Sequence, residues 1–209
     1  MNAIRVSKPV VLLACLVPAV LLAWSAWHDA LGANPISEIT HVTGDWTLRF
    51  VLITLAVTPV RKLTGWNPIV RYRRMLGLFA CFYATLHFLT YLVLDQYFAW
   101  EFILADIAKR PFITVGVLGF VLMIPLALTS TTGWIRRLGG KRWQQLHRLI
   151  YVTAIAGVVH YWWLVKADVS RPFAYGAVLA LLFAMRAWYS ARRSAAPARA
   201  PRAVAPNVS

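Results

Sequence analysis

The sequence predicts an all-α integral membrane protein, a six-helix bundle with both termini in the cytoplasm. Three observations support this fold class. Of the 209 residues, 60% are apolar and only 14% are charged, whereas soluble domains average about 25% charged residues. Six apolar runs approach the length of a membrane-spanning helix. The charged residues divide between alternate connections of those runs, as they do in multi-pass membrane proteins.

The six expected spans show uniform or helical apolar patterns, and the alternation of a membrane β-barrel is absent from the sequence. The first is expected to stay as a helix, because it lacks a small-residue cleavage site after Trp27. The second is the shortest and contains Arg49. The spans are expected at about Val10–Trp27, Trp46–Val60, Leu76–Leu94, Phe112–Thr129, Leu149–Val165 and Phe173–Trp188.

The charges give the orientation. With the N-terminus inside, all seven acidic residues fall on the outer side, and most of the 22 basic residues fall on the inner side. This is the distribution that the positive-inside rule requires, with short loops carrying the bias. Six membrane-spanning helices with both ends on the inner side are therefore expected. The acidic residues are Asp29, Glu38, Asp45, Asp95, Glu101, Asp106 and Asp168.

The chain is expected to form one membrane domain, residues 1–193. Residues 194–209 are rich in Ala, Pro and Arg and are expected to be a disordered cytoplasmic tail. The sequence shows no internal repeat and no glycine-rich phosphate loop. Its two cysteines, Cys15 and Cys81, lie in apolar runs, without the CxxC spacing of a zinc or redox motif.

Three of the five histidines lie in or near the membrane. His87 follows Arg74 by thirteen residues, and His160 follows His147 by thirteen. At 1.5 Å per residue each is about 20 Å from the inner end of its helix. His87 and His160 are thus expected at one depth in the outer half, with His147 near the inner face. His28 and His41 are expected at the membrane edge or outside it.

Two histidines facing each other in an apolar bundle are the arrangement that ligates haem iron. An ionisable residue inside a membrane is also by default a candidate functional residue. His147 and His160 do not share a face of a straight helix, since thirteen residues turn about 220° beyond three full turns. Either the helix is distorted, for example at Gly157, or the two rings serve different sites.

Four segments resemble the ferric-reductase-like transmembrane cytochromes, and more closely the MsrQ family. MsrQ proteins are haem-binding membrane subunits of bacterial periplasmic protein-methionine-sulfoxide reductase systems. The combination of LHRLIY with a following HYWWLVK is the most specific part, and the length and six crossings also fit. The segments are RRMLGLFACFYATLHFLTY (73–91), KRPFITVG (109–116), LALTSTTGWIRRLGGKRWQQLHRLIYV (126–152) and HYWWLVKAD (160–168).

The resemblance implies an electron-transfer subunit, with methionine sulfoxide reduced elsewhere. It implies haem b held by His87 and His160, with His147 as a further candidate ligand, and FMN has also been associated with the family. It implies that electrons cross the bacterial inner membrane, with quinol or a cytoplasmic flavin reductase as the donor. The acceptor would be a periplasmic molybdenum-cofactor (molybdopterin) catalytic subunit that repairs oxidised envelope proteins.

The chain departs from the wider ferric-reductase pattern in two ways. Those cytochromes carry two histidines on each haem-bearing helix, whereas the third span here has only His87, with Arg73 and Arg74 at the inner position. The chain also ends soon after the sixth span, without a flavin and nicotinamide domain. Arginines suit haem propionates or a flavin phosphate, and the candidates are Arg73, Arg74, Arg148 and Arg49.

Two other functions remain open from the sequence. A stand-alone ferric or cupric ion reductase would use the outer acidic residues to gather cations. A small transporter or proton pathway would use His147 and His160 as relay groups and would carry no chromophore.

Overall fold

The protein is helical throughout the part of the chain that the structure, a computed structural model, describes, residues 2–195. No strand occurs among those residues. Most of the expected cytoplasmic tail, residues 196–209, lies outside them. The helical segments are α1 (Asn2–Trp27), α2 (Pro35–Thr64), η1 (Asn67–Tyr72), α3 (Arg73–Leu89), η2 (Thr90–Asp95), α4 (Trp100–Lys109), α5 (Pro111–Leu128), α6 (Thr132–Leu138), α7 (Gly140–Leu146), α8 (Leu149–Leu164) and α9 (Ser170–Ala195).

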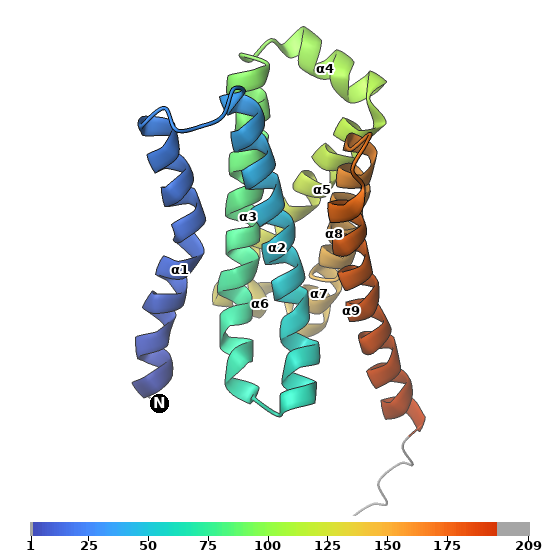
Figure 1. The fold of residues 1–209 in the computed structure, drawn as a ribbon. Coiled ribbons are helices and arrows are strands. Elements are labelled where there is room, and N and C mark those ends of the chain that lie inside the picture. The colour runs from blue at the N-terminus through green and yellow to red at the C-terminus, as the bar shows by residue number, and fades with distance from the viewer. Residues whose placement is uncertain (1, 196–209) are drawn as a thin grey trace, which may run out of the picture.

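The bundle is built from two helix pairs. α2 packs along α3, and α5 packs along α8, while α1 and α9 lie at the sides (Figure 1). The connection from α1 to α2, helix α4 and the connection from α8 to α9 lie at one end, called here the acidic end. The turn at η1 and the short helices α6 and α7 lie at the other, called here the basic end.

Four helical segments of the described chain are long and apolar enough to cross a membrane, so the chain is a membrane protein. Neither α2 nor α8 meets that description by itself, because α2 carries several charged residues and α8 has only 16 residues. The four segments are Ser7–Trp27, Asn67–Asp95, Pro111–Leu128 and Ser170–Arg192.

Helix α2 begins at Pro35, eleven residues before Trp46, where the second membrane span was predicted to start. Asn34 caps the helix by accepting a hydrogen bond from Ser37 N (3.1 Å), and Pro35 occupies the first turn. The threonines of this first part lie inside the helix, and their hydroxyls donate to carbonyls four residues earlier. These bonds join Thr40 to Ile36, Thr43 to Ile39 and Thr47 to Thr43.

Helix α1 is attached to α3 through Tyr83, which is almost completely buried. Its hydroxyl donates to the Cys15 carbonyl (2.8 Å) and accepts from Ala19 N (3.1 Å). These two groups would otherwise pair within α1, and Pro18 between them loosens the helix there. The Tyr83 ring also stacks on Phe50 of α2, with 5.3 Å between ring centres. One tyrosine thus connects three helices.

The helix that carries His160 does not extend back through His147. α7 ends at Leu146 and α8 begins at Leu149, so the chain is interrupted at His147 and Arg148. The helix is not distorted at Gly157, the position named above as an example. Gly157 lies inside regular α8 and packs against Leu48 of α2.

Candidate functional site

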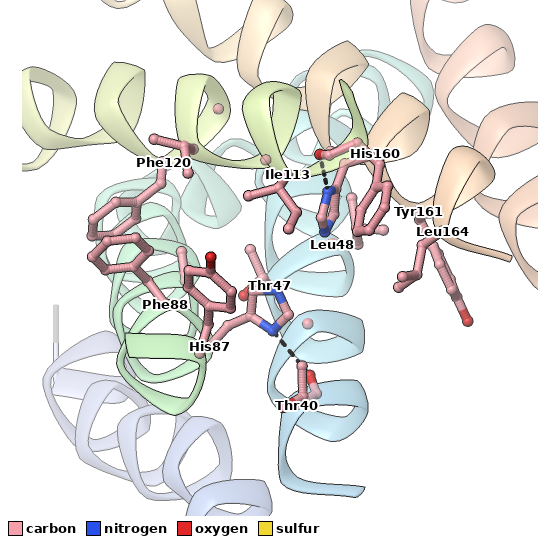
Figure 2. A pocket seen from close by; sticks show the side chains of 18 of the residues that line it. Thr40, Thr47, Leu48, His87, Phe88, Ile113, Phe120, His160, Tyr161 and Leu164 are labelled. Carbon is pink, nitrogen blue, oxygen red and sulfur yellow. Dashed lines mark hydrogen bonds between the residues drawn. The ribbon is translucent and has the colours of Figure 1, made fainter. Parts of the chain in front are cut away.

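A cavity of about 340 Å³ lies between the two helix pairs α2–α3 and α5–α8. His87 of α3 and His160 of α8 both line it, and Figure 2 shows their rings turned toward each other. Most of its wall is apolar, including Phe88 and Phe120, whose rings stack at 4.8 Å. The structure therefore brings together the two histidines that the sequence placed at one depth.

His87 is held by the extended part of α2. Its Nδ1 lies 2.9 Å from the Thr40 carbonyl and 3.5 Å from the Thr43 hydroxyl. Because a carbonyl only accepts hydrogen bonds, Nδ1 carries the proton and donates it. In a neutral imidazole this leaves Nε2 unprotonated and free to ligate a metal.

His160 is held in the same way by α5. Its Nδ1 lies 2.6 Å from the Phe112 carbonyl, so Nδ1 is again the donor and Nε2 the free nitrogen. Figure 2 shows both hydrogen bonds on the far sides of the rings, with the other nitrogens directed into the space between them. A backbone carbonyl on each histidine is the usual arrangement for metal-ligating imidazoles.

The two ring centres are 6.1 Å apart, and the ring planes cross at 79°. A nitrogen about 2 Å from a metal on each side leaves ring centres on the order of 6 Å apart. Among the described residues, no group of three or more His, Cys, Asp or Glu is arranged to hold a metal ion. Two axial nitrogens in an apolar cavity fit haem, whose porphyrin supplies the remaining ligands.

The cavity reaches polar residues at the acidic end. Arg110, which follows α4, is the only arginine or lysine among its lining residues, and it pairs with Asp106 at 3.3 Å. Asp45 and Asp95 also line this part, as does His41, which was expected at the membrane edge or outside it. The cavity thus has one charged end, where an anionic group of a bound molecule can meet an arginine.

The four arginines proposed from the sequence are not among the cavity-lining residues. Arg49 lies beside the charged end, where it pairs with Asp45 (3.7 Å) and donates to the Tyr175 hydroxyl (3.2 Å). Arg73, Arg74 and Arg148 lie where α3 and α8 begin, at the basic end.

His147 lies apart from the histidine pair. Its Nε2 is 3.1 Å from the Thr129 hydroxyl, and its ring stacks on Trp143 with centres 3.9 Å apart. Trp143 Nε1 in turn donates to the Thr129 carbonyl at 2.9 Å. Burial, and secondarily the nearby charge of Arg73, lower the pKa of His147, which favours the neutral ring. Of the two possibilities considered for His147 and His160, the geometry favours different sites.

His28 also lies away from the cavity. Its ring is exposed and packs on Trp24, whose carbonyl is 3.0 Å from His28 Nδ1.

Two features of the site were not predicted from the sequence: the groups that contact the two histidine rings, and the position of Arg110 on the cavity wall. The partners are Thr40 and Gly44 on α2 and Phe112 and Gly116 on α5. The available signal was a glycine inside each helix, because such glycines often mark a close approach. Nothing in the sequence indicated which ring each glycine would face.

Comparison with known proteins gives two results. Residues 43–158 match the family described as "Ferric reductase like transmembrane component". The chain is also similar to proteins named "Protein-methionine-sulfoxide reductase heme-binding subunit MsrQ". One, from Herminiimonas arsenicoxydans, is 53% identical over 88% of this chain and 85% of the relative. Another, from Xanthomonas oryzae pv. oryzae (strain MAFF 311018), is 49% identical over 96% and 98% of the two chains.

Proposed function

We propose a function from one premise: the chain belongs to the ferric-reductase-like transmembrane family and, within it, to the MsrQ heme-binding subunits of protein-methionine-sulfoxide reductase. The proposed function is transfer of electrons through haem b across the bacterial inner membrane to a methionine sulfoxide reductase. His87 and His160 are the proposed axial ligands. The observation that carries this assignment is the pair of free Nε2 atoms facing one cavity.

Bound haem would supply a one-electron Fe(III)/Fe(II) couple. The residues of the chain do the rest. His87 and His160 would hold the haem iron through Nε2, and their carbonyl partners raise the basicity of both rings. The mostly apolar wall, including Phe88 and Phe120, would limit the contact of a bound group with water. Arg110 at the charged end offers a partner for propionate groups.

The proposed topology has six crossings, with both termini in the cytoplasm. α2 and α8 are not among the four segments that qualify as spans by length and composition, but each packs along one that does: α2 along α3 and α8 along α5. The acidic end then faces the periplasm, and the basic end faces the cytoplasm. The histidine pair lies toward the periplasmic side.

This orientation gives electrons a direction. The proposed acceptor is a periplasmic molybdenum-cofactor (molybdopterin) methionine sulfoxide reductase that repairs envelope proteins, docking at the acidic end close to the cavity. The proposed donor is quinol or a cytoplasmic flavin reductase. If FMN is bound, its phosphate would suit an arginine at the basic end, where Arg73, Arg74 and Arg148 lie at the starts of α3 and α8.

The test is an optical spectrum of the detergent-purified protein, oxidised and dithionite-reduced, with pyridine haemochrome quantitation. A reduced b-type spectrum is expected for the wild type and for His28→Ala, whose ring lies away from the cavity. His87→Ala and His160→Ala are each expected to lose that spectrum. A normal haem content in either folded variant would refute the assigned pair, and a colourless wild type made with haem supplied would refute the function.

A further inference from the structure

The two histidines are held by equivalent features on two different helices. α2 presents the Thr40 carbonyl and, four residues later, Gly44 to the His87 ring. α5 presents the Phe112 carbonyl and, four residues later, Gly116 to the His160 ring. Each ring thus meets a carbonyl and a glycine one helical turn apart.

The glycines allow an approach that a side chain would prevent. A Cβ atom on Gly116 would lie 2.7 Å from His160 Nδ1 and 2.9 Å from Cε1. One on Gly44 would lie 3.1 Å from His87 Cε1 and 3.2 Å from Nδ1. The first contact is closer than real structures accept, and the second is tight.

Helix geometry explains why the glycine follows the carbonyl by four residues. Each Cα–Cβ bond tilts toward the helix N-terminus, so the Cβ of residue i+4 would stand beside the carbonyl of residue i. A ring that donates to this carbonyl needs that space. Only glycine at i+4 leaves it open.

We propose that Gly44 and Gly116 are positioning residues, which hold the two axial imidazoles in crossed planes and keep both Nδ1–carbonyl hydrogen bonds. Each ring plane is set by its own neighbouring helix, and the planes cross at 79°. The inference rests on the proposed haem ligation by His87 and His160. It adds that backbone contacts from α2 and α5 set the electronic properties of the iron.

Two measurable properties follow. Crossed axial imidazole planes leave the iron dxz and dyz orbitals nearly degenerate, which gives ferric low-spin haem a strongly anisotropic EPR signal with a large gmax. A hydrogen bond from Nδ1 makes the imidazole a stronger electron donor, which stabilises Fe(III) and lowers the midpoint potential. A ring moved by a new methyl group would change both properties.

The first test is EPR of the oxidised wild-type protein. A large-gmax signal is expected. An ordinary rhombic signal, in a protein that contains haem b and loses it in His87→Ala and His160→Ala, would overturn the crossed-plane inference and leave the proposed function standing. Failure of the proposed function is seen separately, in the optical spectrum.

The second test uses Gly116→Ala and the milder Gly44→Ala. Each is expected to keep the haem within about twofold of the wild-type ratio, with a smaller gmax and a higher midpoint potential, and Gly116→Ala is expected to change more. Gly77→Ala is the control, because its Cβ would meet only Thr54 Cγ2, at 3.7 Å, and Gly77 does not line the cavity. If Gly116→Ala fails to bind haem, the gmax and midpoint potential of Gly44→Ala decide whether the inference holds. An unchanged gmax and potential in the glycine variants that bind haem would overturn the inference.

Discussion

The rings of His87 and His160 lie 6.1 Å apart and cross at 79°, although their residues are 73 positions apart in the chain. Each ring gives its Nδ1 proton to a carbonyl of a third or fourth helix, Thr40 of α2 or Phe112 of α5. Four helices thus define one site. This arrangement, together with its surroundings, leads to four predictions.

Arg110→Gln is expected to weaken haem retention several-fold, because among the described residues Arg110 is the only arginine or lysine that lines the cavity. Its ion pair with Asp106 is largely exposed and stabilises the fold by at most about 1 kcal/mol. Haem-to-protein ratios after extended detergent washing measure the effect. Arg49→Gln, beside the cavity but not lining it, is the matched control. Equal retention in both variants would exclude a propionate contact at Arg110.

His147→Ala is expected to leave the haem of His87 and His160 intact, since its ring bonds Thr129 away from the cavity. The loss of this hydrogen bond is expected to cost about 1 kcal/mol of stability. Pyridine haemochrome quantitation separates three results. An unchanged ratio confirms the prediction, a fall to about half shows a second haem at His147, and complete loss in a folded protein contradicts the separation of the sites.

Arg186→Leu is expected to destabilise the protein by about 2 kcal/mol, because a buried carbonyl loses its partner. Pro59 has no N–H, so the Leu55 carbonyl on α2 lacks its usual helical donor. Arg186 of α9 donates to that carbonyl instead, and also to the Tyr151 hydroxyl at 2.8 Å. The Arg186 guanidinium therefore joins α9 to α2 at the carbonyl that Pro59 leaves without a helical hydrogen bond.

A double-mutant cycle tests this relationship. Adding Pro59→Ala to Arg186→Leu restores an N–H that the Leu55 carbonyl can accept, and is expected to recover about 1 kcal/mol. The measurement is the free energy of unfolding in detergent. Purely additive effects of the two substitutions would show that Arg186 does not compensate for the proline.

The proposed crossings of α2 and α8 can be tested by cysteine labelling in a Cys15→Ala/Cys81→Ala background. Asp29→Cys and Thr64→Cys flank α2, and Lys141→Cys and Asp168→Cys flank α8. An impermeant maleimide added to spheroplasts is expected to label positions 29 and 168 alone, with the other two reacting only after permeabilisation. Labelling of both flanks from one side would show that the helix between them does not cross.

The sequence by itself determined the class of the molecule, the approximate helices and the relation of depth between the histidines. Apolar content and run length require a membrane protein. A fixed rise per residue converts spacing into depth, so His87 and His160 were expected at one depth, and their ring centres lie 6.1 Å apart. Helix ends were harder, because threonines that bond their own helix, such as Thr40 and Thr43, look like loop residues in a sequence.

Tertiary structure alone decided which faces of the helices meet. Spacing gives the position of a residue along its helix, but the direction of its side chain depends on how neighbouring helices pack. That packing placed the Phe112 carbonyl and Gly116 against His160, and it separated His147 through the break before α8. It also set Arg110, rather than the four arginines chosen from charge, on the wall of the cavity. The depth of a residue follows from its position along one helix and can be predicted from the sequence. The orientation of its side chain about the helix axis depends on how the helices pack against each other.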